Sequence, residues 1–285
     1  MELEPEGIVP PDDDAKGGGD GVTQQIEALL DEDRCEEALR LIGEAVAAGK
    51  GNPLDLAFLA GDAYMAMGQA RRAEAKFREV LAQDPDCASS RCWLAMSLFL
   101  QWRFDEAEVA VQAALEVPEP IADVHAVHGA LLERRGEFDA AEASFERAAT
   151  VAPDKYWLPE RMTRQEFDRE VRRAARKLPR QFRQALDRVP VVVQDVPEPS
   201  LAEGDEGDEV APDILGLFVG VPLPETSDYE LPQLRPNTIY LFQRNLERAA
   251  HDREDLIEQI RITLWHELAH YLGFEEEDME DLGLE

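Results

Sequence analysis

The chain has few cysteines, few basic residues and no long apolar run. Three cysteines (Cys35, Cys87 and Cys92) make no even set of disulfides, so we read them as reduced thiols of a cytoplasmic protein. No run approaches the roughly 18 apolar residues of a transmembrane helix. Residues 1–21 lack the basic and apolar regions of a signal peptide, and their acidic, proline- and glycine-containing sequence predicts a disordered leader.

Acidic residues outnumber basic ones by 61 to 29, which gives a formal net charge of −32. Such a chain repels the phosphates of nucleic acid at long range, whereas its charge is compatible with a basic protein partner or substrate. Basic residues gather only between 161 and 188. A basic helix is able to bind an acidic surface, but this segment is more typical of a solvated helix face.

An alanine recurs every 34 residues in the first half of the chain, at Ala73, Ala107 and Ala141. Other positions follow the same period, with a small residue in the first helix of each unit and a large one in the second. The small residues are Gly61, Ala95 and Gly129, and the large ones are Phe77, Val111 and Phe145. Small residues allow two helices to approach closely, and the large residue fills the gap between successive hairpins.

These positions resemble the tetratricopeptide repeat family, whose period is 34 residues. A less regular unit precedes them, so we predict about four units over residues 22–155, with the first acting as a cap. Stacked repeats of this kind present a concave face that holds peptides or protein segments. We therefore expect a docking module for a protein partner, and the alternative is a structural spacer.

After Pro153 the pattern changes to mixed helices and strands. A capping box at residues 163–166 predicts a helix to about Lys177, and Pro179 starts a second helix that ends near Arg188. Three β-rich runs follow, at residues 189–193, 214–221 and 238–242. The acidic, glycine-containing stretch 197–212 between the first two runs predicts a mobile loop.

The sequence His266-Glu267-Leu268-Ala269-His270 carries the pattern H-E-x-x-H, and Gly273 follows three residues later. Residues four apart lie on one face of a helix, so both imidazoles can reach a single ion while Glu267 projects beside them. This spacing is typical of a hydrolytic zinc site in which the glutamate is the general base. The alternative is a pair of histidines that only cap core contacts.

Residues 252–272 read as one helix around this motif, with Asp252 as the N-cap and Gly273 at the end. Apolar residues recur at helical spacing and predict a buried stripe of Ile257, Ile260, Leu264, Leu268 and Tyr271. The histidines fall outside this stripe, on a strip with Gln259, Ile262 and Thr263. We expect that strip to present His266 and His270 to a cleft.

A catalytic zinc ion needs a third protein ligand and one open position. Few residues follow His270, so a local ligand is favoured over a glutamate on a later helix. In H-E-x-x-H-x-x-G-x-x the next position is Glu276, where metzincins carry histidine, and zinc accepts a carboxylate oxygen there. Glu275 and Asp278 lie nearby and are read as parts of a solvated acidic tail.

The order of helices, strands and motif resembles the small bacterial minimal zincin family of metallopeptidase-like domains. Five segments carry the resemblance: residues 174–182, 191–193, 215–223, 236–241 and 266–283. That family usually has aspartate where this chain has Glu276. The expected fold class is therefore multidomain, with an all-α tetratricopeptide-type superhelix followed by a small α+β zincin-like domain over residues 156–285.

The resemblance and the residues imply the same chemistry, with His266, His270 and Glu276 holding Zn²⁺ and Glu267 as the catalytic base. An edge strand beside the helix would pair with an extended substrate, and both the 214–221 run and the 238–242 run remain open for this. Candidates for an oxyanion donor are Tyr229, Tyr240, Arg244 and His251.

The predicted function is a zinc metallopeptidase whose repeat domain recruits a substrate or partner protein. One alternative is a non-catalytic scaffold in which zinc only stabilises the small domain. That site would need a fourth protein ligand, for which Glu275 and Asp278 are candidates. Another alternative is a regulator that binds a peptidase without cleaving anything.

Overall fold

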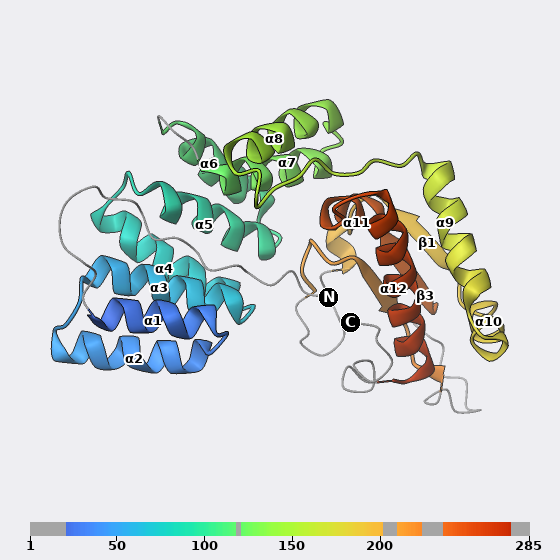
Figure 1. The fold of residues 1–285 in the computed structure, drawn as a ribbon, viewed down its shortest axis with the longest axis horizontal. Helices are drawn as coiled ribbons and strands as arrows, with labels where there is room; N and C mark the ends of the chain where they lie inside the picture. The colour runs from blue at the N-terminus through green and yellow to red at the C-terminus, as the bar shows by residue number, and fades with distance from the viewer. Residues whose placement is uncertain (1–20, 118–120, 202–209, 224–235, 275–285) are drawn as a thin grey trace. The chain divides into compact units, whose positions relative to one another are not determined.

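The computed structural model describes residues 21–117, 121–201, 210–223 and 236–274. The chain forms two compact units that divide between Trp157 and Leu158 (Figure 1). The predicted leader lies outside the described residues, except that Gly21 is already the first residue of a helix. In the described part of the chain, no helix is both long enough and apolar enough to cross a membrane.

The first unit, residues 21–157, consists of antiparallel helix pairs, which confirms the helical prediction (Figure 1). All three cysteines lie in this unit as free thiols. In order, its helices are α1 (Gly21–Asp31), α2 (Cys35–Ala48), α3 (Pro53–Ala66), α4 (Ala70–Gln83), α5 (Ala88–Leu100), α6 (Phe104–Leu115), α7 (Ala122–Arg134) and α8 (Phe138–Val151).

Small residues meet large ones where the two helices of a pair cross. A Cβ atom on Gly61 would lie 2.6 Å from the ring of Phe77, and one on Gly129 would lie 2.4 Å from the ring of Phe145. The middle unit replaces glycine by a fully buried Ala95 and phenylalanine by a fully buried Val111. Alanine is larger than glycine and valine is smaller than phenylalanine, so the two changes offset each other and the interior stays close-packed.

The turn inside each helix pair contains one residue with positive φ, at equivalent positions of the four units. Gly68 and Gly136 adopt φ values of 68° and 74°, which glycine tolerates without steric cost. Asp33 and Trp102 adopt 56° and 61° at the same place. The ring of Trp102 lies edge-on to Phe104, and the guanidinium of Arg134 lies 5.0 Å from its centroid.

The second unit combines helices with a small sheet. A Thr163–Glu166 capping box opens its first helix as predicted. Its elements are α9 (Arg164–Lys177), α10 (Arg180–Leu186), β1 (Val191–Gln194), a 3-10 turn (Pro199–Leu201), β2 (Gly216–Val219), β3 (Thr238–Phe242), α11 (Gln243–Ala249) and α12 (Arg253–Leu272). Of the predicted loop 197–212, residues 202–209 lie outside the described chain.

The sheet has the strand order β1-β3-β2, so β3 is the central strand. β1 pairs with β3 in parallel, and β2 pairs with β3 antiparallel, with Gly216 opposite Leu241. Helix α12 packs on β2, β3 and α9, and Figure 1 shows it running across the sheet. The core of the unit lies between these elements and includes Phe167, Ile239, Leu241, Ile260 and Leu264.

Helix α11 is an element that the sequence did not predict, because its residues Gln-Arg-Asn-Leu-Glu-Arg-Ala read as a polar connection. Only Leu246 anchors it in the apolar core. The side chain of Glu247 in this helix has no solvent exposure. Its carboxylate accepts four hydrogen bonds in place of contacts with water. The donors are the side chains of Arg161, Arg244 and Gln243 and the backbone N–H of Met162, at 2.7–3.0 Å.

Candidate metal centre

Helix α12 carries the H-E-x-x-H motif and has well-defined ends. The Asp252 carboxylate accepts hydrogen bonds from the backbone N–H groups of Glu254 and Asp255, at 2.8 and 3.0 Å. Gly273 ends the helix at a φ of 84°, and its N–H donates to the carbonyl of His270. Both predicted caps are therefore confirmed, and they place the second histidine in the last turn.

The apolar side of α12 follows the predicted stripe with one change. Ile260, Leu264, Leu268 and Tyr271 are buried, but Ile257 is only partly buried, and Leu256 takes its place in the core. The side chain of Tyr271 also contacts Phe218 of β2, with ring centroids 5.6 Å apart. The stripe fixes the rotation of the helix, and hence the direction in which the histidines project.

His266 and His270 face each other across one turn and are half-buried. Their Nε2 atoms lie 3.1 Å apart, and their ring centroids lie 4.7 Å apart. Two nitrogens bound to one zinc ion at about 2.0–2.1 Å with a tetrahedral angle lie about 3.3 Å apart. The two imidazoles are thus arranged as a pair of ligands to one ion would be.

Glu267 is only 7% exposed, because β2 covers it. A Cβ atom on Gly216 would lie 2.9 Å from its Oε1 and 2.6 Å from Cγ2 of Thr263. Only glycine fits at this point of the strand. Gln259 and Thr263, which share the strip of the histidines, are also buried, since β2 packs closely on this side of the helix.

The predicted third ligand, Glu276, lies outside the described residues, together with Glu275 and Asp278. Within residues 21–274, apart from the gaps named above, no cluster of three His, Cys, Asp or Glu side chains is placed to hold a metal ion. The described part of the site therefore consists of the two imidazole nitrogens and, next to His266 in the sequence, the buried Glu267 side chain.

The described candidates for an oxyanion donor have contacts elsewhere in the unit. Arg244 pairs with the buried Glu247 at 2.9 Å. The ring of Tyr240 stacks on Phe242. The backbone N–H of His251 donates to Asp255 at the start of α12, and Tyr229 lies outside the described residues.

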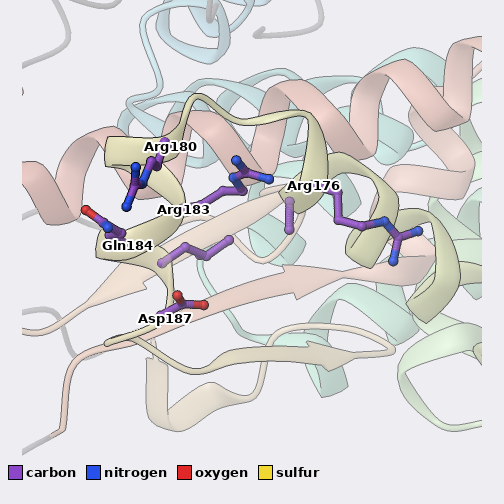
Figure 2. A pocket seen from close by; sticks show the side chains of 7 residues that line it. Arg176, Arg180, Arg183, Gln184 and Asp187 are labelled. Carbon is purple, nitrogen blue, oxygen red and sulfur yellow. The ribbon is translucent and has the colours of Figure 1, made fainter.

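A hollow of about 390 Å³ lies elsewhere on this unit, between the end of α9 and α10. Figure 2 shows Arg176, Arg180, Arg183, Gln184 and Asp187 around it. These five residues are exposed, and none belongs to the H-E-x-x-H motif. The basic residues around the hollow therefore lie on a solvated helix face, whereas Arg161 of the same segment pairs with the buried Glu247. The hollow is separate from the candidate metal centre.

Family models match two parts of the chain. A tetratricopeptide repeat model matches residues 58–125, and a zincin-like metallopeptidase model matches residues 186–284. No curated protein is significantly similar to the chain.

Solved structures similar to the chain include MamA, with 20% identity, a TM-score of 0.39, and coverage of 45% of this chain and 74% of that one. A thermophilic tetratricopeptide repeat protein of Thermus thermophilus has 20% identity, a TM-score of 0.41, and coverage of 46% and 73%. YrrB, described as a tetratricopeptide repeat protein with an unusual peptide-binding site, has 20% identity, a TM-score of 0.40, and coverage of 47% and 68%. The family models confirm both resemblances: the chain joins tetratricopeptide repeats to a carboxy-terminal zincin-like metallopeptidase domain.

Proposed function

We propose that the protein is a cytoplasmic zinc metallopeptidase whose repeats recruit a substrate or partner protein. The observation that carries the proposal is the 3.1 Å separation of the His266 and His270 Nε2 atoms on a helix whose Glu267 side chain is buried under Gly216. The match to zincin-like metallopeptidases over residues 186–284 supports it. The free thiols fit a reducing compartment.

His266 and His270 would supply two zinc ligands, and Glu276 would supply a carboxylate oxygen as the third. Zinc, when bound, lowers the pKa of a coordinated water toward 7 and polarises a carbonyl. Imidazole and carboxylate are both among the ligands that zinc prefers, so the donor set fits a catalytic site with one open position.

Glu267 would act as the proton carrier. Its carboxylate would accept a proton from the attacking water and return it to the leaving amine. Burial against Gly216 limits the rotamers of Glu267, because Cγ and Oε1 both lie close to the strand backbone. A base held in this way is oriented before substrate arrives, and orientation is a large part of what an active site contributes.

Strand β2 would hold the substrate. In the part of the chain that the structure describes, β2 lies at one edge of the sheet, whereas β3 is central and has both sides occupied. The 238–242 run, which the sequence left open for this role, is therefore excluded as an edge strand. An extended peptide added along β2 would pass beside Glu267, because Gly216 contacts that side chain.

Metal analysis joined to a peptide-library cleavage assay tests the proposal. We expect one zinc per chain in the wild-type protein, cleavage that stops on chelation, and cleavage that returns when zinc is restored. His266→Ala and His270→Ala should each weaken zinc binding by more than about 100-fold, since loss of a mere supporting contact already costs about 10–100-fold.

The third ligand is tested by zinc affinity in matched carboxylate variants. Glu276→Ala should weaken zinc binding by at least about tenfold, and Glu275→Ala and Asp278→Ala should stay within about twofold. If Glu275→Ala or Asp278→Ala weakens zinc binding as much as Glu276→Ala, and no peptide is cleaved, the site is a closed structural one and the chain is a scaffold.

A further inference from the structure

Acidic residues recur on the first helices of the repeats. Asp55 of α3 and Asp123 of α7 occupy the same repeat position, two repeat lengths apart. Asp62 follows Asp55 by two helical turns, and Glu27 of α1 is its counterpart in the first unit. Asp31 lies one turn beyond Glu27. We call Glu27, Asp31, Asp55, Asp62 and Asp123 the acidic face.

Four of these carboxylates, those of Glu27, Asp31, Asp55 and Asp62, lie close enough to influence one another. Burial, followed by the charges of Asp31 and Asp55, raises the pKa of Glu27. Burial alone raises the pKa of Asp55. Repulsion between carboxylates and loss of solvent both disfavour negative charge at the acidic face. The chain as a whole also carries a large excess of acidic residues.

Asp62 is the most buried member of the face, with 7% of its surface exposed. Among the residues that the structure describes, nothing donates a hydrogen bond to its carboxylate or pairs with it as an ion. A buried carboxylate without a partner is costly. Burial and the charge of Asp31 accordingly raise the pKa of Asp62 to about 7.

One cation of the chain already lies at this face. Lys155 follows the last repeat helix, and its Nζ lies 2.8 Å from Oδ1 of Asp123. The hydroxyl of Tyr156 donates to the same oxygen at 2.9 Å. The charge of Lys155 also acts on Asp62, whose pKa it lowers, but it forms no ion pair there. A lysine side chain therefore fits at this face, and Asp62 has no ion pair of its own in the described chain.

We propose that the acidic face binds an extended protein segment that carries lysine or arginine, with one cationic side chain paired to Asp62. This proposal rests on the proposed function, because it gives the chemistry of the partner that the repeats recruit. A cationic side chain supplies what Asp62 lacks, namely an opposite charge and hydrogen-bond donors in a partly desolvated place. An acidic segment would meet repulsion from all five carboxylates.

Peptide binding to the full chain tests this, measured in the Glu267→Gln background so that the probe is not cut. The probe is a fluorescent peptide of four Gly-Ala-Lys repeats, and its counterpart has glutamate in place of lysine. At about 150 mM salt, general attraction to the negative chain is largely screened. We expect the lysine peptide to bind and the glutamate peptide not to bind.

Two charge-matched variants separate Asp62 from the net charge. Asp62→Asn should weaken binding of the lysine peptide by about tenfold or more, because it removes a charged hydrogen-bond acceptor. Glu146→Gln removes the same charge from an exposed position on α8, and should stay within about twofold. Lys155→Gln removes the internal competitor and should strengthen binding severalfold.

Equal effects of Asp62→Asn and Glu146→Gln, or failure of the lysine peptide to bind, would overturn the proposal. Circular dichroism of the variants checks that each is folded. The result is distinguishable from failure of the peptidase proposal, because zinc content and cleavage are measured separately. If the chain binds no zinc but binds the lysine peptide in a way that depends on Asp62, the peptidase proposal is contradicted and the acidic-face proposal is supported.

Discussion

The two units of the chain each bury a carboxylate, and they treat it in opposite ways. In the carboxy-terminal unit, Glu247 is fully buried and receives hydrogen bonds from two arginines, a glutamine side chain and a backbone N–H. In the repeat unit, Asp62 is almost as deeply buried, but nothing in the described chain pairs with it. Burial alone therefore does not reveal the role of a carboxylate, whereas the groups that pair with it do.

Glu247 is a structural residue on this reasoning. It joins α11 to the segment before α9, since its partners Arg161 and Met162 are more than 80 positions away in the chain. Asp62 costs its unit stability, which is typical of a group kept for a ligand.

The largest effect on stability is expected for Glu247→Gln. Removing one partner of a buried ion pair leaves the others unpaired and costs about 3–5 kcal/mol. Because Arg161 and Arg244 keep some solvent contact, we expect the lower end of that range. Urea unfolding with hydrogen exchange, which resolves the two units, measures it. The control is Glu254→Gln at an exposed position, which should change the free energy of unfolding by no more than about 0.5 kcal/mol. If Glu247→Gln lowers the free energy of unfolding as little as the control does, Glu247 does not stabilise the unit.

Asp62 should make the repeat unit less stable as pH rises. Its pKa is raised from 3.8 to about 7 in the folded chain, so the folded state binds more protons than the unfolded one between these values. Its contribution is therefore most favourable below pH 4 and is lost as pH rises toward 7.

The matching variant is Asp62→Asn, which carries no titrating group. We expect it to be more stable than wild type at pH 8, by a few kcal/mol at most. We also expect its free energy of unfolding to fall less steeply as pH rises, because the contribution of Asp62 is gone. The readout is the urea midpoint of the repeat unit between pH 4 and pH 8. An unchanged slope in the variant would mean that Asp62 is not a costly buried carboxylate.

Glycines in the two units should also respond differently to substitution. Gly129→Ala would drive a Cβ atom into the Phe145 ring, and overpacking of this kind costs about 1–3 kcal/mol.

Gly216→Ala would displace Glu267. There we expect cleavage to fall by about 100-fold, the cost of misplacing a catalytic group by about 1 Å, with zinc content retained. Normal cleavage by Gly216→Ala would contradict the positioning of Glu267 by β2.

The smallest effect is expected at Trp102, which adopts positive φ where two other units have glycine. Trp102→Gly and Trp102→Ala both lose the contacts to Phe104 and Arg134. Only glycine also relieves the backbone, so it should be the more stable of the two by about 1 kcal/mol. Paired thermal unfolding curves measure the difference. If the alanine variant is equally stable, the turn carries no strain.

Much of the repeat unit was predictable because its contacts are local and periodic. Gly61 and Phe77 belong to one helix pair, so a 34-residue period revealed both the fold and their contact. The H-E-x-x-H helix was predictable for a similar reason, since its caps and its apolar stripe are local patterns. Trp102 lies one repeat length from both Gly68 and Gly136, so the period relates its left-handed turn to theirs.

Features that depend on distant parts of the chain were not predictable. Helix α11 has the sequence of a polar connection. The contacts that hold it come from Arg161 and Met162, which lie far away in the sequence. The burial of Glu267 depends on Gly216, which no spacing rule connects to the motif. Asp62 is an ordinary aspartate in the sequence, and only the packing around α3 isolates it.

The central claim is that Glu267 performs proton transfer beside metal held by His266 and His270. Its most direct test compares peptide hydrolysis by wild type, Glu267→Gln and the control Glu254→Gln, each at equal zinc occupancy. We predict that Glu267→Gln keeps its zinc and loses cleavage by about 100- to 10,000-fold, the usual contribution of a positioned base, while Glu254→Gln matches wild type. Equal hydrolysis by wild type and Glu267→Gln at full zinc occupancy would contradict the claim.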